Sequence, residues 1–319
     1  MSIKIWVLIT RSFFLIHLHF SLKYSMESKD RILDFTEKLP SRVFTGDQER
    51  NNRIINSTIA FLASYTVVYV SFQLVTALFA KRYNLFYKLF FFKVEYTQNW
   101  DYWQIEPVLK TFLAGPVFCL FAGIICFIIQ NSVRKRPGII KFFWLWLGVN
   151  YLNFVGTQVI LLPIKSGSQN IHASNLGVVS TYLFWDDFTK IIFSIVASLL
   201  MIYVGFLASK PFIQTSNSTN NVYKNENKVV YLFHVVFLPY IIGSGITLVY
   251  FNDGYFILNI TIILTLFITV ISIFINSLKN RMIMIYRFPE TNAIENRFLI
   301  FLASALILMK IFFNNGISF

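Results

Sequence analysis

Few residues that could do chemistry lie within the apolar stretches of this chain. Six stretches are long and apolar enough to cross a bilayer, at about 55–80, 108–130, 139–164, 188–208, 229–250 and 255–275, since a spanning helix needs about 20 mostly apolar residues. Asp and Glu are absent from five of them, and the exception, 188–208, carries the pair Asp186 and Asp187 at its mouth. Ionisable groups at membrane depth are costly and mark functional candidates. Their scarcity argues against proton or metal chemistry inside the membrane.

One stretch, 139–164, carries a polar pattern. Trp146, Asn150, Asn153 and Thr157 recur at spacings of four, three and four, so they share one helical face, and Gln158 is adjacent. Amides buried in lipid hydrogen-bond across helices, at roughly 0.6–2 kcal/mol each. We therefore expect the stripe to hold this helix to its neighbours. The alternative is a polar wall of a substrate path or site.

Small residues form a second pattern. Gly115, Cys119 and Gly123 repeat every four residues, a spacing that lets two helix backbones approach closely, so we interpret them as packing positions. Gly243 and Gly245 flank Ser244 in a later stretch. They favour a closely packed or flexible helix, or a break of the kind that lines binding sites in some membrane proteins.

The remaining candidates are isolated. His234 lies within the stretch 229–250 with no second ligand nearby in sequence, so a structural hydrogen bond is the expected role. His172, Asp186 and Asp187 share the loop 165–187. The acidic pair is expected to cap the helix that follows, where carboxylates suit the positive end of the dipole. We expect no metal and no cofactor, because no phosphate loop, nucleophile elbow or HExxH motif is present in the sequence.

Composition indicates lipid as the main solvent. Apolar residues make up 56% of the chain and charged residues 13%, against about 45–50% and about 25% in soluble domains. The net charge of +13 comes from Lys and Arg concentrated between apolar runs, as on the cytoplasmic side of membrane proteins. This pattern excludes a nucleic-acid partner and predicts a cytoplasmic N-terminus. Abundant Phe, Ile, Asn and Lys suggest an AT-rich bacterial genome, and hence the bacterial inner membrane.

These features predict an all-α, polytopic bundle of about seven spans (six to eight), the last being a short run at 298–313, with a small aromatic β-hairpin between the first two. Residues 1–25 are read as a doubtful extension or interfacial helix and 26–54 as a cytoplasmic lead-in. Residues 55–209 form a core of four spans, 210–228 a polar linker, and 229–319 a C-terminal membrane part of two or three spans. The oligomeric state stays open.

The order helix, aromatic hairpin, helix with Ala114-Gly115-Pro116 and Gly123, basic turn, then helix with Asn150, Asn153 and Leu162-Pro163-Ile164 resembles the core of site-2-type membrane metalloproteases. The similarity covers residues 55–165. In that family the first core helix carries HExxH and the third supplies an aspartate ligand. Here 61–68 contain neither His nor Glu, and 165–168 contain no aspartate. The resemblance therefore implies a non-catalytic relative.

We expect a non-enzymatic scaffold, accessory or sensing subunit, with the bilayer and another membrane protein as partners. A transporter or channel for a neutral or amphiphilic solute is the first alternative, with a polar route through Asn150, Asn153, Thr157, Gln158, Gln73 and His234. An interfacial lipid-acting enzyme is the second, with acid–base groups among Glu95, Asp101, Glu106, Asp186, Asp187 and His172.

Overall fold

The computed structural model describes residues 46–90, 94–96, 104–133, 139–164, 174–216, 225–250, 256–279, 296–313 and 315–318. All of them belong to one compact unit, Gly46–Phe319. The expected extension at 1–25, most of the lead-in at 26–54, and His172 and Asp101 lie outside the described residues.

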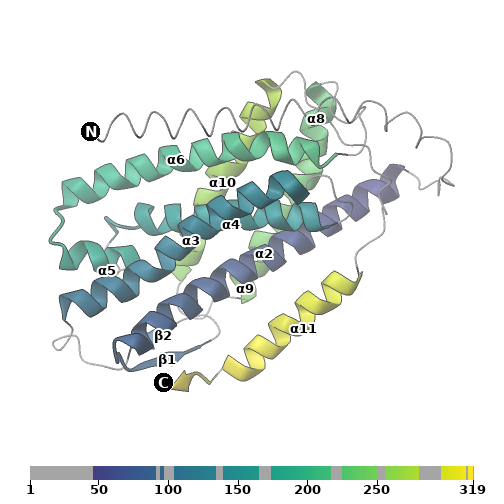
Figure 1. Cartoon of the computed structure of the whole chain (residues 1–319). Coiled ribbons are helices and arrows are strands. Elements are labelled where there is room, and N and C mark those ends of the chain that lie inside the picture. Colours follow the sequence, from purple (N-terminus) through teal and green to yellow (C-terminus); the bar gives the residue numbers. More distant parts are fainter. Residues whose placement is uncertain are drawn as a thin grey trace. The chain divides into compact units, whose positions relative to one another are not determined.

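The described part is a helical bundle with a small sheet, as the sequence predicts (Figure 1). Its long helices are α2 (Gly46–Arg82), α3 (Ile105–Val133), α4 (Ile140–Ile160), α6 (Asp187–Gln214), α10 (Phe256–Lys279) and α11 (Asn296–Phe313). A further span starts as α8 (Asn225–Leu232), continues through the π-helix η2 (Phe233–Phe237) and ends as α9 (Leu238–Tyr250). The short helix α5 (Asn175–Tyr182) precedes α6.

Helix α4 lies at the centre of the bundle, in contact with α2, α3, α6 and α10. Apart from Ile140, every residue of α4 is buried or half-buried. One core cluster gathers residues of α2, α4, α6, α9 and α10 around it, with Trp146, Tyr69 and Phe154 among the largest buried side chains. This cluster includes residues from both sides of 210–228.

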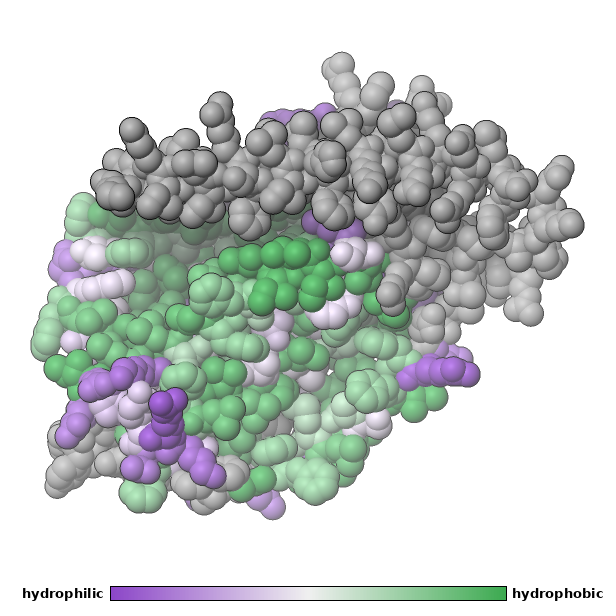
Figure 2. Space-filling view, in the orientation of Figure 1, coloured by the Kyte–Doolittle hydropathy of each residue, from purple (hydrophilic) through white to green (hydrophobic). Residues whose placement is uncertain are grey.

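Among the described residues, six helices are long and apolar enough to cross a membrane. Helix α11 is one of them, whereas α4, which covers most of the expected stretch 139–164, is not. On the face that Figure 2 shows, apolar residues cover the middle of the described part and hydrophilic residues gather towards its ends. Such a distribution suits a multi-pass membrane protein, whose outer helices face lipid.

The expected hairpin is present, and the C-terminus adds a third strand. Strand β1 (Tyr87–Leu89) pairs antiparallel with β2 (Val94–Tyr96) and, on its other edge, with β3 (Ile317–Ser318). Because β1 follows α2 and β3 follows α11 within a few residues, these two helices end on the same side of the bundle. An even number of crossings would place the two ends on opposite sides. The six apolar helices therefore need α4 as a seventh span.

Two local features differ from the sequence-based expectations. Part of the expected loop 165–187 is the helix α5, which is capped by Ser174 through its hydroxyl and the amide of Gly177. Val178 and Val179 pack against α3 and offset the cost of ordering this short segment. The helix α9 runs without interruption through Gly243 and Gly245, so the irregularity in this span is η2, upstream of both glycines.

Candidate functional site

The candidate site is the polar face of α4, described from its N-terminal to its C-terminal end. Trp146 donates its indole N–H to the hydroxyl of Ser57 on α2, at 3.0 Å. Ser57 in turn donates to the backbone carbonyl of Val235 in η2, at 2.5 Å. Both side chains are fully buried. This relay joins three elements and ends at the π-helix, a distortion that often accompanies functional sites.

One turn further along, Asn150 also bonds to α2. Its amide nitrogen donates to the hydroxyl of Ser64 at 2.8 Å, and that hydroxyl donates to the carbonyl of Phe61 in its own helix. The ring of Phe61 meets the indole of Trp146 edge-on, with centroids 4.9 Å apart. The α2–α4 interface is thus both polar and aromatic.

The C-terminal half of the polar stripe contacts α10 and α5. Asn153 donates its amide nitrogen to the carbonyl of Ile262, at 3.0 Å. The hydroxyls of Thr157 and Thr265 lie 2.7 Å apart. Gln158 accepts the backbone N–H of Asn175 at the start of α5, at 2.8 Å. The predicted stripe therefore shares one helix, but its members bond to three different neighbours and do not converge on a common point.

The small-residue positions lie at helix contacts. A Cβ at Gly115 would meet the ring of Phe72 on α2 at 2.7 Å, and one at Gly123 would meet Leu152 on α4 at 2.7 Å. Cys119 lies between them, fully buried, and is a free thiol. Gly115, Cys119 and Gly123 thus form the surface of α3 that packs against α2 and α4.

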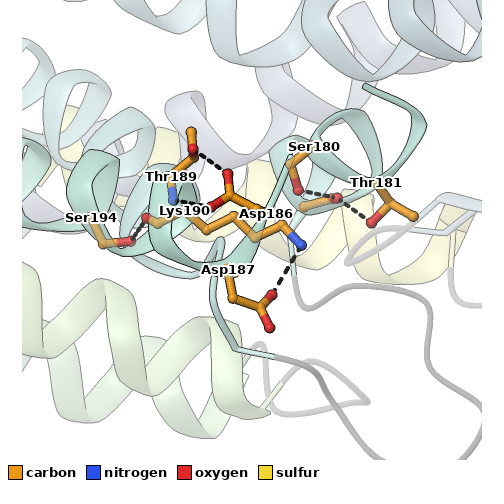
Figure 3. A network of polar contacts seen from close by, with 8 residues as sticks. Ser180, Thr181, Asp186, Asp187, Thr189, Lys190 and Ser194 are labelled. Atoms are coloured by element: carbon orange, nitrogen blue, oxygen red, sulfur yellow. Dashed lines mark hydrogen bonds and ion pairs between the residues drawn. The ribbon is translucent and has the colours of Figure 1, made fainter. Parts of the chain in front are cut away.

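The acidic pair lies at the start of α6 (Figure 3). Asp186 is the N-cap residue: it accepts hydrogen bonds from the hydroxyl and the backbone N–H of Thr189, which confirms the expected cap. These hydrogen bonds, the hydroxyl first, hold the pKa of Asp186 below its ordinary value. Asp187 forms an ion pair with Lys190 at 3.5 Å, and that lysine side chain is only 10% exposed.

The other ionisable candidates lie apart from this pair. Glu106 forms an i,i+4 ion pair with Lys110 on α3. His234 lies in η2, half-buried, with its ring against Phe233 at 6.0 Å. Among the described residues, no group of three or more His, Cys, Asp or Glu side chains is arranged to hold a metal ion.

Sequence reasoning missed the partners of the stripe. Ser57 and Ser64 of α2 are seven residues apart, so they share one helical face, but this spacing does not identify the helix that the face contacts. Thr261, Thr265 and Thr269 recur every four residues on α10, a signal that could have been found. Thr265 bonds to α4, and Thr269 donates to the carbonyl of Met201 on α6 at 3.4 Å.

Comparisons of this chain with protein-family models, with curated proteins and with solved structures found no match.

Proposed function

We propose that this integral membrane protein is a non-enzymatic scaffold, accessory or sensing subunit of a membrane complex. One observation carries the proposal: the polar donors of the α4 stripe hold neighbouring helices together, and the acidic pair serves within its own helix. The donors of Trp146, Asn150 and Asn153 bond to α2 and α10. The carboxylates of Asp186 and Asp187 serve a helix cap and an ion pair.

The exposed surface of α11 supports a second membrane protein as the partner. Only 6% of the apolar stretch of α11 is buried, against 56% of that of α2. It contacts the bundle through Tyr250, whose hydroxyl donates to the carbonyl of Leu306 at 2.6 Å. Ile307 is 59% exposed on α11, whereas Leu302 is 7% exposed. We propose that a transmembrane helix of another protein lies against this exposed side.

A photo-crosslinking amino acid at Ile307 tests this role. We expect a discrete heavier product that contains a second membrane protein, identified by mass spectrometry after purification in mild detergent. The same amino acid at Leu302 faces the bundle and should give no such product. Crosslinks to lipid alone from Ile307 would contradict the accessory role.

The finer assignments extend the same proposal. A bacterial inner membrane and a cytoplasmic N-terminus agree with the basic residues between the apolar runs. Kinship with site-2-type proteases, as a non-catalytic relative, agrees with the order α2, hairpin, α3, α4. In place of a zinc motif, α2 presents Phe61 and Ser64 to α4.

Transport of a neutral solute is the second candidate function, favoured by one observation. The side-chain oxygen of Asn153 is buried and has no hydrogen-bond partner. Uptake of a neutral solute into proteoliposomes that is abolished by Asn150→Leu and Asn153→Leu, but not by Ser304→Ala on α11, would favour transport over the scaffold.

A further inference from the structure

The amide group of Asn153 has a fixed orientation that leaves one atom unsatisfied. A carbonyl oxygen can only accept, so the contact with Ile262 must be made by the amide nitrogen. The amide oxygen then points elsewhere, and it has no hydrogen-bond partner. Asn153 is 0% exposed. Leaving a buried acceptor unsatisfied costs about 1–3 kcal/mol, and lipid offers no donor to relieve that cost.

A second unsatisfied oxygen lies on α9. The hydroxyl of Ser244 is buried, at 5% exposure for the residue, and has no partner. Tyr240 donates its hydroxyl to the carbonyl of Ile263 at 3.0 Å, which sets the register between α9 and α10.

The register brings Ser244 to the level of Asn259. Phe237 meets Phe274 and Tyr240 meets Phe267, so α9 and α10 are antiparallel. One turn forward from Tyr240 on α9, to Ser244, therefore corresponds to one turn back from Ile263 on α10, to the buried Asn259. Asn153 bonds to the carbonyl of Ile262, less than one turn from Asn259. Asn153 of α4 and Ser244 of α9 therefore lie at nearly the same level of α10.

Electrostatics select the chemistry of what binds there. In the described parts of α4, α9 and α10, the charged residues are Lys141, at the N-terminus of α4, and Lys279, at the C-terminus of α10. A cation is disfavoured, since Asn259 lies in the first turn of α10, where the helix dipole is positive. An anion is disfavoured by the acceptor oxygen of Asn153. The remaining class is an uncharged molecule with an O–H or N–H donor.

We propose that Asn153 and Ser244 bind one small, uncharged hydrogen-bond donor between α4, α9 and α10, either a water molecule or the hydroxyl or amide group of a neutral solute. The guest donates to the amide oxygen of Asn153 and bonds to the hydroxyl of Ser244. This site deepens the sensing part of the proposed function, and it rests on that part alone.

A double-mutant cycle tests the shared guest. The wild type, Asn153→Leu, Ser244→Ala and the double variant are unfolded by SDS in mixed micelles. Neither polar atom bonds to the other, so a hydrogen-bonded coupling must pass through a guest. We expect the folding equilibrium constants to depart from additivity by at least about threefold. Additivity within about twofold overturns the proposal. If the leucine variant does not fold, Asn153→Ala enters the same cycle.

The control cycle combines Asn150→Leu with Ser244→Ala. Asn150 loses a comparable amide bond, at 2.8 Å, but its partner is Ser64 on α2, so this cycle should be additive. Repeating the main cycle after exhaustive dialysis separates the two sources. Coupling that persists identifies water, coupling that is lost identifies an exchangeable solute, and coupling absent throughout overturns the site. Loss of the crosslinked partner at Ile307 would leave this result untouched.

Discussion

The relay from Trp146 through Ser57 to Val235 gives the sharpest prediction about stability. Ser57→Ala removes two interhelical hydrogen bonds, of 3.0 and 2.5 Å. Such bonds contribute about 0.6–1.7 kcal/mol each in a bilayer protein. The substitution also leaves the fully buried indole N–H of Trp146 without its acceptor, at a further cost of about 1–3 kcal/mol. We expect the free energy of unfolding to fall by about 2–6 kcal/mol.

Reversible unfolding in SDS mixed micelles, followed by tryptophan fluorescence, measures this loss. Ser304→Ala is the matched control, because Ser304 is exposed on α11 and bonds only to the carbonyl of Phe301 in its own helix. It should change the free energy of unfolding by less than about 0.5 kcal/mol. Equal losses in the two variants would refute the reasoning.

A second background isolates the contribution of the orphaned indole. In Trp146→Phe the N–H group is absent, so Ser57→Ala removes the bond to Val235 alone. The serine substitution should therefore cost about 2–5 kcal/mol less in that background than in the wild type, because neither the bond to the indole nor the orphaned N–H is present. The same cost in both backgrounds would show that Ser57 acts through packing and not through the relay.

Three further predictions follow from the contacts described above. Gly245→Ala should stabilise the protein by about 0.5–1 kcal/mol, because the added Cβ meets nothing within 4 Å. Gly243→Ala should cost about 1–3 kcal/mol, because its Cβ would collide with a buried phenyl ring on α2. Unfolding in SDS checks the sign of both effects. Lys88 and Ser318 are partners in the β1–β3 ladder, so cysteines at both positions should form an oxidation-dependent link visible as a gel shift, and failure to link would contradict the pairing. The pKa of Asp186 is lowered in the folded state, so its ionised form stabilises the fold above the ordinary carboxyl pKa, and this stability is lost as the pH falls through the acidic range. Asp186→Asn should therefore flatten the slope of melting temperature against pH in that range. An unchanged slope would count against the cap.

Much of the bundle follows from the sequence for a simple reason. A stretch of about 20 apolar residues in lipid must be helical, because its backbone groups have no other partners. The spacing of Trp146, Asn150, Asn153 and Thr157 likewise dictates a shared face. What the spacing does not contain is the identity of the partners. Ser57 and Thr265 lie 89 and 108 residues from the side chains they contact, so their roles exist only once the helices are packed.

Two local elements show a different limit. The π-helix η2 needs one carbonyl satisfied from outside, and Ser57 of another helix supplies that hydrogen bond to Val235. Helix α5 spans only eight residues, too short to be stable alone, and forms where Val178 and Val179 meet α3. Both depend on contacts with other segments, so a local pattern predicts neither.

The composition of α4 explains why this central span is not among the six helices that are apolar enough to cross a membrane. A helix that faces lipid must be apolar on its outer side, as α6 and α11 are, with Leu199 and Ile307 exposed. A helix enclosed by α2, α3, α6 and α10 meets little lipid, so its side chains can be Asn, Thr and Gln if neighbouring helices supply partners. The donors of Asn150 and Asn153 have such partners. Low apolarity is therefore a consequence of the central position of α4, and the pairing of β1 with β3 requires that this helix cross with the others.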